Sequence, residues 1–320
     1  MNFIDFHADT LYRLFYRPQG EAGDLQRNSC QVDLKRLASS GYAAQVFACF
    51  LDIEKPPQTD SCYGDVLGMA DLFTQQVQKY RDQVRFAGNY NQYRDNLSHG
   101  FISGFLSLEE GGVLEGQITR LDSLYKKGVR IMNLTWNHEN CLGYPHRPPE
   151  FQKKGLKPFG IDVVRRMDEL GIIVDVSHLS DQGFWDVVRY GTRPFLATHS
   201  NARALRKVSR NLTDHMIRAV ADCGGIVGLN LYPAFLAEPP SHNVDAILHH
   251  LKHMINQGGR QSVGLGTDFD GMDLPPTIKD ASNMPYLVQA MEQAGFSSGQ
   301  IEGVCYRNAE QFFQRYWSES

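Results

Sequence analysis

The sequence lacks any long apolar run, and its charge is close to balanced. No apolar stretch approaches the roughly 20 residues of a membrane-spanning helix. The first residues, Met1 to His7, lack a basic segment followed by an apolar one, so no secretory signal is visible. The net charge of -4 forms no basic footprint, which argues against nucleic acid as a partner. We therefore expect a cytoplasmic protein that binds neither a membrane nor a nucleic acid.

Cysteine is also sparse, and none of the six cysteines lies in a CxxC pair. In a reducing compartment we expect free thiols, several of them buried among apolar side chains. The remaining composition is ordinary for a globular protein, with 42% hydrophobic and 21% charged residues. A length of 320 residues is long for an average domain but typical of one α/β barrel.

Short apolar runs alternate with helical patterns along the whole chain. Eight of these runs have the length and composition of buried parallel strands. No linker-like break divides them, and two helices follow the last one. The pattern predicts a (β/α)8 TIM barrel with C-terminal helical additions, forming a single domain over residues 1–320. The predicted strands are residues 2–6, 43–50, 104–108, 129–135, 171–177, 194–198, 225–230 and 263–266, and residues 64–85 are predicted as one long helix.

Two of these runs end in a histidine, His178 and His199. The segment between them, residues 179–193, has the length of one crossover helix, so the two strands are expected to be parallel neighbours. Their carboxyl ends would then present both histidines on one rim, where α/β folds bind ligands. The alternative is that both are structural histidines with satisfied hydrogen bonds.

Other strand ends carry further candidate ligands. His7 and Asp9 are two residues apart at the end of the first strand, so both can reach one cation. Glu109 and Glu110 follow the third strand, where adjacent buried carboxylates are costly without a cation or a donor nearby. A solvated turn is the alternative for this pair. Asp268 follows the eighth strand.

These strand ends together offer three imidazoles and three carboxylates without matching basic residues, which requires divalent cations. Nitrogen and oxygen ligands without thiolate suit Zn²⁺, with Mn²⁺, Co²⁺ and Fe²⁺ as alternatives. Two cations about 3.5–4 Å apart, sharing one carboxylate, would use every member. A metal-bound water is then the expected nucleophile, and Asp268 can take its proton and pass it to a leaving group. Asp270, two residues on, is the alternative proton carrier.

With these motifs the chain resembles the membrane (renal or microsomal) dipeptidase family of binuclear zinc peptidases. The resemblance covers essentially the whole chain. Each motif is of moderate specificity, and the combination in this order is specific. The matching motifs are His7-x-Asp9, Ser177-His178, Thr198-His199-Ser200, Arg210-Asn211 and Gly266-Thr267-Asp268-Phe269-Asp270-Gly271.

The resemblance implies a role for each matched residue. It implies that His7 and Asp9 hold one Zn²⁺, that His178 and His199 hold the other, and that a glutamate bridges the two ions. It also implies that Arg210 holds the carboxylate of a dipeptide substrate and that Tyr232 lies near the site. Asp268 is implied as the general acid and base. Either Glu109 or Glu110 could be the bridge. Glu109 keeps the family's interval to the turn at residues 128–130, whereas Glu110 precedes two glycines as the family's glutamate does. Neighbouring residues of a strand point to opposite faces, so only one of the two glutamates can bridge the ions, and we expect that it is Glu109.

Two features depart from the family pattern. The animal members have a substrate-contacting histidine where this chain has Trp136, and His138, two residues on, is the expected catalytic substitute. The secretory and lipid-anchor signals of the animal members are also missing, so the membrane association in the family's name is not expected here.

The predicted function is that of a zinc-dependent dipeptidase, which hydrolyses dipeptides by attack of a metal-bridging hydroxide. The first alternative is a related metal-dependent amidohydrolase acting on a cyclic amide, a lactam or an N-acyl amino acid. The second is a non-catalytic metal-binding or scaffold protein, which would need a missing ligand or base. The sequence leaves open the side-chain preference, the metal and the oligomeric state, a homodimer included.

Overall fold

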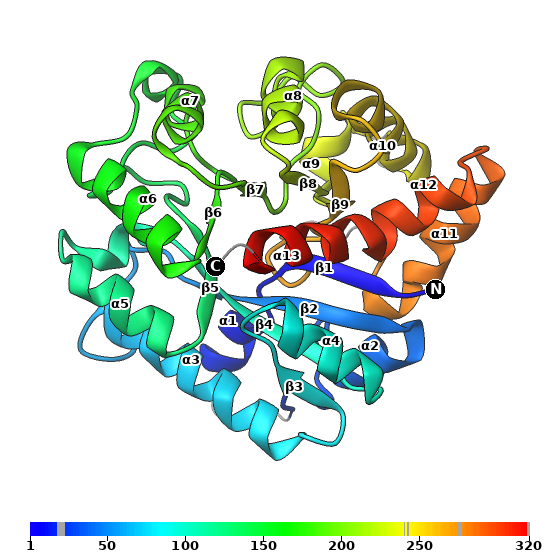
Figure 1. Ribbon diagram of the computed structural model, residues 1–320, viewed down its shortest axis with the longest axis horizontal. Helices are drawn as coiled ribbons and strands as arrows, with labels where there is room; N and C mark the ends of the chain where they lie inside the picture. The colour runs from blue at the N-terminus through cyan, green and yellow to red at the C-terminus, as the bar shows by residue number, and fades with distance from the viewer. Residues whose placement is uncertain (18–22, 240, 242, 274–276, 319–320) are drawn as a thin grey trace.

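Parallel strands form a closed barrel with helices around it (Figure 1). The computed structural model describes residues 1–17, 23–239, 241, 243–273 and 277–318. Eight of the strands in these ranges close in the order β1-β2-β4-β5-β6-β7-β8-β9, and β9 pairs again with β1. This confirms the predicted (β/α)8 TIM barrel. The strands are β1 (Phe3–Ala8), β2 (Tyr42–Phe50), β3 (Val84–Phe86), β4 (Ile102–Glu109), β5 (Val129–Asn133), β6 (Ile173–Asp175), β7 (Leu196–Ala197), β8 (Ile226–Leu229) and β9 (Val263–Leu265).

The helices follow the strands as crossovers and cover the outside of the barrel. Many begin with a side chain that accepts a hydrogen bond from a free backbone N–H of the first turn, such as Asp33, Ser61 and Ser180. The helices are α1 (Thr10–Phe15), α2 (Leu34–Ser40), α3 (Cys62–Lys79), α4 (Tyr90–Ser98), α5 (Ile118–Lys126), α6 (Pro158–Leu170), α7 (Asp181–Tyr190), α8 (Asp214–Asp222), α9 (Pro233–Leu236), α10 (Val244–Gly258), α11 (Met284–Gln293), α12 (Ser298–Glu302) and α13 (Asn308–Ser318). Short 3-10 helices span Gly111–Leu114, Pro149–Lys153 and Ala281–Asn283, and a π-helical turn spans Gly303–Arg307.

The prediction of one helix over residues 64–85 was wrong at its C-terminal end. Helix α3 ends at Lys79, and β3 pairs with the start of β4 through Val84 and Ile102. Val84 lies four residues after Tyr80, so it continues the apolar period of the helix although it belongs to a strand. Helix α4 was not predicted because it buries only Tyr93 and Asn96 and therefore has no apolar stripe.

The end of the barrel where the strands begin is closed by α13, which crosses the front of the barrel in Figure 1. The Phe313 ring lies 4.8 Å from the Phe105 ring and 5.7 Å from the Phe6 ring. The Tyr316 hydroxyl donates a 2.9 Å hydrogen bond to the carbonyl oxygen of Ile172, just before β6. This end is therefore filled with apolar side chains, and the polar strand ends gather at the opposite end.

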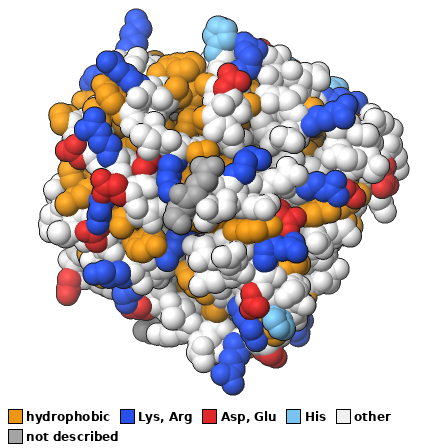
Figure 2. Space-filling view, in the orientation of Figure 1, with side chains coloured by type: hydrophobic (Ala, Val, Ile, Leu, Met, Phe, Trp, Pro, Cys, Tyr) orange, Lys and Arg blue, Asp and Glu red, His pale blue; other side chains and the backbone are white. Residues whose placement is uncertain are grey.

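Charges of both signs are interspersed on the face shown in Figure 2, which is the face crossed by α13. Within the described ranges, no helix is both long enough and apolar enough to span a membrane.

Candidate active site

The polar strand ends meet at the rim opposite α13. His7 lies in β1 and Asp9 just after it, Glu109 is the last residue of β4, and His178 and His199 follow β6 and β7. All five residues are buried, with at most 9% of the surface of each exposed. The fold thus brings together the five residues that the sequence predicts as metal ligands, from four strands far apart in the chain.

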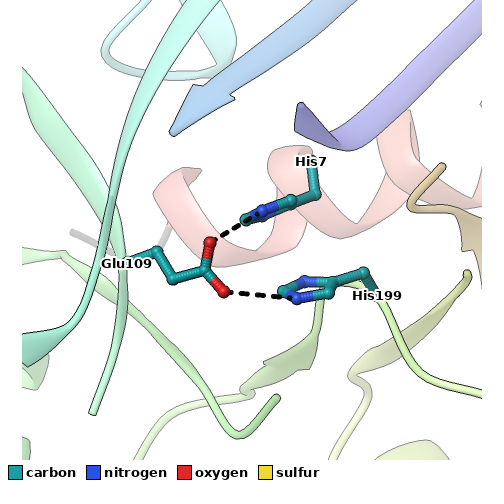
Figure 3. A group of neighbouring side chains, drawn as sticks. All are labelled: His7, Glu109 and His199. Carbon is teal, nitrogen blue, oxygen red and sulfur yellow. Dashed lines mark ion pairs between the residues drawn. The ribbon is translucent and has the colours of Figure 1, made fainter. Parts of the chain in front are cut away.

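Glu109 points one carboxylate oxygen toward His7 and the other toward His199 (Figure 3). Its Oε2 lies 3.0 Å from His7 Nε2, and its Oε1 lies 3.0 Å from His178 Nε2 and 3.5 Å from His199 Nε2. His7 Nε2 is also 3.6 Å from Asp9 Oδ2. The two oxygens of Glu109 therefore face two different groups of ligands, which is the arrangement a bridging carboxylate requires.

The cluster fits divalent cations. The ligand atoms of His7, Glu109 and His199 all lie within 4.8 Å of one another, and so do those of His7, Asp9 and Asp268. Among the described residues, Nδ1 of His7 and Oδ1 of Asp9 are buried and have no hydrogen-bond partner. Nitrogen and oxygen atoms converge here from histidine and carboxylate side chains alone, a set that suits Zn²⁺ or a similar ion.

Burial dominates the ionisation of this cluster. It raises the pKa of Glu109 to about 7, with the negative charges of Asp9 and Asp268 acting in the same direction. It also raises the pKa of Asp268 to about 6. Burial and the charge of Arg210 hold the pKa of His178 well below the usual range for histidine. Burial likewise lowers the pKa of His199, whereas the pKa of His7 is raised well above its usual range because the charges of Glu109 and Asp9 outweigh the effect of burial. Carboxylates that resist ionisation beside the neutral imidazoles of His178 and His199 are an environment that bound cations would stabilise.

Hydrogen bonds orient both histidines that follow β6 and β7. His199 Nδ1 lies 2.7 Å from Thr198 Oγ1, and the Thr198 hydroxyl donates to Asp175. His178 Nδ1 lies 3.4 Å from Asn137 Oδ1. A neutral imidazole that donates through Nδ1 keeps its Nε2 lone pair for a cation, so these contacts direct both Nε2 atoms toward Glu109. 

Asn137 itself is held by a neighbour that sequence reasoning missed. Its Oδ1 lies 3.1 Å from Nε2 of His146, whose Nδ1 lies 2.9 Å from Ser209 Oγ. Burial, together with the charges of Arg210 and other arginines, lowers the pKa of His146 to about 3, so the ring is neutral. His146 lies in a segment rich in proline and basic residues, whose composition resembles that of an ordinary surface loop.

Asp5 and Asp175 each accept two hydrogen bonds from a threonine at the end of a neighbouring strand. Asp5 accepts hydrogen bonds from N and Oγ1 of Thr267, at 2.9 and 2.6 Å. Asp175 accepts from N and Oγ1 of Thr198 in the same way. Each carboxylate thereby fixes the end of a neighbouring strand, next to Asp268 in one case and His199 in the other. Asp5 and Asp175 could both be recognised in the sequence, because each is a carboxylate inside an apolar run that predicts a buried strand.

Glu110 points away from the cluster. Its carboxylate accepts hydrogen bonds from Gly112 N at 2.7 Å, Trp136 N at 3.0 Å and Asn140 Nδ2 at 2.6 Å. Its φ of 99° turns the backbone sharply after β4. The geometry therefore supports Glu109 as the bridge and assigns Glu110 to the turn.

Asp268 and Asp270 also differ in their surroundings. Asp268 Oδ2 accepts a 2.9 Å hydrogen bond from Asn230, and the side chain borders a cavity. Asp270 is buried and accepts from the Thr10 hydroxyl at 2.6 Å and from the backbone of Gln31. A Cβ atom at Gly271 would lie 2.1 Å from Asp9 Oδ2 and 2.6 Å from Asp268 Oδ1, so any larger residue would displace these carboxylates.

The predicted substrate residues lie at different depths. Arg210 is 3% exposed and donates to Ser200 Oγ at 2.8 Å and to the His199 carbonyl at 2.9 Å. Its Nε is buried and has no partner in the part of the chain that the structure describes. Tyr232 borders the cavity, and its hydroxyl donates to Asp273 at 2.6 Å. 

His138 lies between two acidic residues of the segment after β2. Its Nε2 is 3.0 Å from Asp52 Oδ1, and its Nδ1 is 3.1 Å from Glu54 Oε1. Trp136, by contrast, borders the cavity with its ring 4.9 Å from the Phe50 ring.

A cavity of about 610 Å³ opens above the cluster. This volume is in the range of small-molecule sites. Its walls combine members of the cluster with aromatic and cationic side chains. The lining residues are Asp9, Phe50, Lys55, Glu109, Trp136, Asn137, His146, Arg147, His178, Tyr232, Ala234, Phe235, Asp268, Gly271 and Asp273.

Comparison with known proteins agrees with this geometry. The family model described as "Membrane dipeptidase (Peptidase family M19)" matches residues 1–317. An uncharacterised dipeptidase of Schizosaccharomyces pombe is 28% identical over 291 residues, which are 87% of this chain and 71% of the relative. A Klebsiella pneumoniae protein named for its place in the pqqA 5' region is 34% identical over 222 residues, 66% of this chain and 81% of the relative.

Two solved structures are similar over 99% of both chains, each with a TM-score of 0.91. One is described as dipeptidase AC, a metallopeptidase of family M19, and is 28% identical. The other is a metallopeptidase from Rhodobacter sphaeroides bound to a phosphinate mimic of the dipeptide L-Ala-D-Ala, and is 27% identical.

Proposed function

The chain belongs to the membrane dipeptidase family, peptidase family M19, and is a metal-dependent dipeptidase, and we propose that it uses two divalent cations, expected to be Zn²⁺. The observation that carries this proposal is the position of Glu109, whose two carboxylate oxygens face separate groups of ligands. The proposed ligands are His7 and Asp9 for one cation, His178 and His199 for the other, and Glu109 for both.

The cations, when bound, would lower the pKa of a water molecule and polarise the scissile carbonyl. The protein's own contribution is to hold the ligands and to move a proton. Asp268 borders the cavity and has a pKa of about 6, raised by burial, so it can accept a proton near neutral pH. Asn230 holds one carboxylate oxygen of Asp268 and leaves the other able to carry that proton to the departing amine.

Arg210 and Tyr232 are proposed to bind the free carboxylate of the dipeptide. The Nε–H of Arg210 is a buried donor that has no partner among the described residues, and a substrate carboxylate would satisfy it. The Phe235 ring lies 5.7 Å from the Arg210 guanidinium and 4.7 Å from the Tyr232 ring, and both aromatic residues border the cavity. His138, which is paired with Asp52 and Glu54, is better placed to hold the segment after β2 than to contact substrate.

The experiment combines metal analysis with a change of substrate. We expect about two divalent ions per chain at full occupancy, and activity that a chelator abolishes. Dipeptides with a free carboxylate should be cleaved, whereas their C-terminal amides should not. Arg210→Lys keeps the charge but loses the planar fork, so kcat/KM should fall. An active preparation with only traces of metal would refute the metal proposal, and equal rates on acid and amide would remove the role of Arg210.

Composition and charge support three further expectations, which stay predictions: a single domain over residues 1–320, a cytoplasmic location, and no nucleic-acid or membrane partner. A homodimer stays open.

A further inference from the structure

Arg147 places a cationic side chain on the cavity wall that the proposed function does not use. It is exposed, it borders the cavity, and in the described part of the chain it forms neither an ion pair nor a side-chain hydrogen bond. Lys55 borders the same cavity from the segment after β2. Its side chain is 67% exposed, and its Nζ is 3.8 Å from the nearest paired acid, Asp52.

The acidic residues of the cavity are already engaged. Asp9, Glu109 and Asp268 belong to the proposed metal and proton-transfer groups. Asp273 accepts the 2.6 Å hydrogen bond from Tyr232. Arg147 is therefore left to interact with a charge that comes from outside the protein.

The backbone that carries Arg147 is firmly held. The neighbouring His146 N–H donates a 2.7 Å hydrogen bond to the carbonyl of His178, and Ser180 N–H donates to the carbonyl of Tyr144 at 3.0 Å. The His146 ring is fixed by Ser209 and Asn137, as described above. The backbone position of Arg147 is therefore fixed, because Arg147 directly follows His146, which is hydrogen-bonded to the proposed metal ligand His178.

The position of Arg147 also indicates which part of a substrate it would face. Arg147 lines the same cavity as His178, a proposed metal ligand, and Tyr232, which lies beside the proposed carboxylate site of Arg210. A dipeptide has one backbone carboxylate, which Arg210 and Tyr232 would take. A second carboxylate near Tyr232 would have to come from the side chain of the C-terminal residue.

We propose that Arg147, assisted by Lys55, selects dipeptides whose C-terminal residue is aspartate or glutamate by binding the side-chain carboxylate. This inference rests on the proposed function, because it uses the substrate orientation set by Arg210. The guanidinium fork matches a carboxylate in two parallel hydrogen bonds, whereas the isosteric amide of asparagine or glutamine offers one acceptor and no charge.

The test compares acids with their isosteric amides on the metal-loaded protein. The kcat/KM values for Ala-Glu and Ala-Gln, and for Ala-Asp and Ala-Asn, are measured with both L and D C-terminal residues. We expect the acid to be preferred about tenfold or more, as charge-assisted hydrogen bonds would provide. In Arg147→Gln the acid-to-amide ratio should fall close to one, and Arg147→Lys should retain part of it.

A matched control is Arg165→Gln. Arg165 is also an exposed arginine, but it lies on α6 and does not border the cavity. This variant should keep the wild-type ratio and rates. Melting temperatures of all three variants would show that a change in the ratio does not come from unfolding.

Several outcomes would overturn the inference. They are a wild-type ratio near one, a preference for Glu-Ala over Gln-Ala instead of for C-terminal acids, and an equal loss of Ala-Glu and Ala-Gln activity in Arg147→Gln. Hydrolysis of neutral dipeptides without an acid preference would refute this inference alone. Failure to cleave any dipeptide with metal bound would refute the proposed function as well.

Discussion

At the scale of single residues, two adjacent glutamates perform different tasks. Glu109 faces His7, His178 and His199, whereas Glu110 is surrounded by three N–H donors. Both are buried, and burial raises the pKa of each. The two glutamates differ in the groups that contact their carboxylate oxygens, and substitution of each residue can test this difference.

We expect Glu109→Gln to reduce the bound metal and Glu110→Gln to reduce stability. The first change replaces a ligand oxygen at the centre of the cluster. The second turns an NH2 group toward backbone donors and should lower the free energy of unfolding by about 1–3 kcal/mol with the metal retained. Metal analysis and urea unfolding of the two variants would test this, and the reverse pattern would identify Glu110 as the bridge.

The Asp268 prediction separates proton transfer from metal binding. Asp268→Asn should leave the fold and the metal nearly intact and lower kcat by about 10²-fold or more, because the amide cannot accept the proton. Asp270→Asn should affect kcat less, since its carboxylate is occupied by Thr10 and Gln31. Metal analysis and steady-state kinetics are the measurements. If Asp268→Asn empties the site, Asp268 acts mainly as a ligand, and the proton must move through another group.

At the scale of elements, α13 closes one end of the barrel while the cavity lies at the other. Phe313 is fully buried and contacts Phe6, Phe105 and Tyr93. Phe313→Ala should lower the free energy of unfolding by about 3–5 kcal/mol, because it leaves a void among aromatic rings. The kcat/KM of the folded fraction should remain close to wild type.

The control for Phe313→Ala is Tyr286→Ala on α11, where the aromatic side chain is 48% exposed. Its effect on unfolding should stay within about 0.5 kcal/mol. Thermal and urea unfolding would measure both variants. A large loss of kcat/KM in fully folded Phe313→Ala would show that α13 influences the site across the barrel.

At the scale of the whole molecule, metal binding and pH should be linked. In the metal-free protein, burial raises the pKa of Glu109 to about 7 and that of Asp268 to about 6, above their ordinary values near 4. Raised carboxyl pKa values contribute stability that is complete below the ordinary pKa and lost as the pH rises through the raised one. Cations need the ionised carboxylates, so their affinity should increase over the same window.

We therefore expect the rise in melting temperature caused by Zn²⁺ to grow between about pH 5.5 and about pH 8. Scanning calorimetry or fluorimetry with Zn²⁺ and with a chelator would measure it at each pH. Glu109→Gln should show a smaller pH dependence, because one of the titrating ligands is gone. A metal-induced shift that is constant with pH would contradict the link.

The alternation of apolar runs with helical patterns was enough to predict the barrel, and the motifs at the strand ends could be recognised directly in the chain. These features are local: buried strands are short apolar runs, crossover helices have a 3.6-residue period, and a ligand such as His199 directly follows its strand. The family resemblance rested on these motifs and was confirmed over residues 1–317. The same local reasoning failed at Val84, where a strand residue continued the period of the preceding helix.

Which residues contact the metal-ligand cluster depends on packing in three dimensions and could not be predicted from neighbouring positions in the sequence. Glu109 faces the cluster because β4 ends there, while the backbone turn at Glu110 directs the next carboxylate to Trp136 and Asn140. His146 approaches His178 through a segment that reads as a plain loop, and Arg147 reaches the cavity only because that segment is bound there. These contacts join residues 26 or more positions apart in the chain, or depend on a single backbone angle, and neither is encoded in a local pattern of residue types.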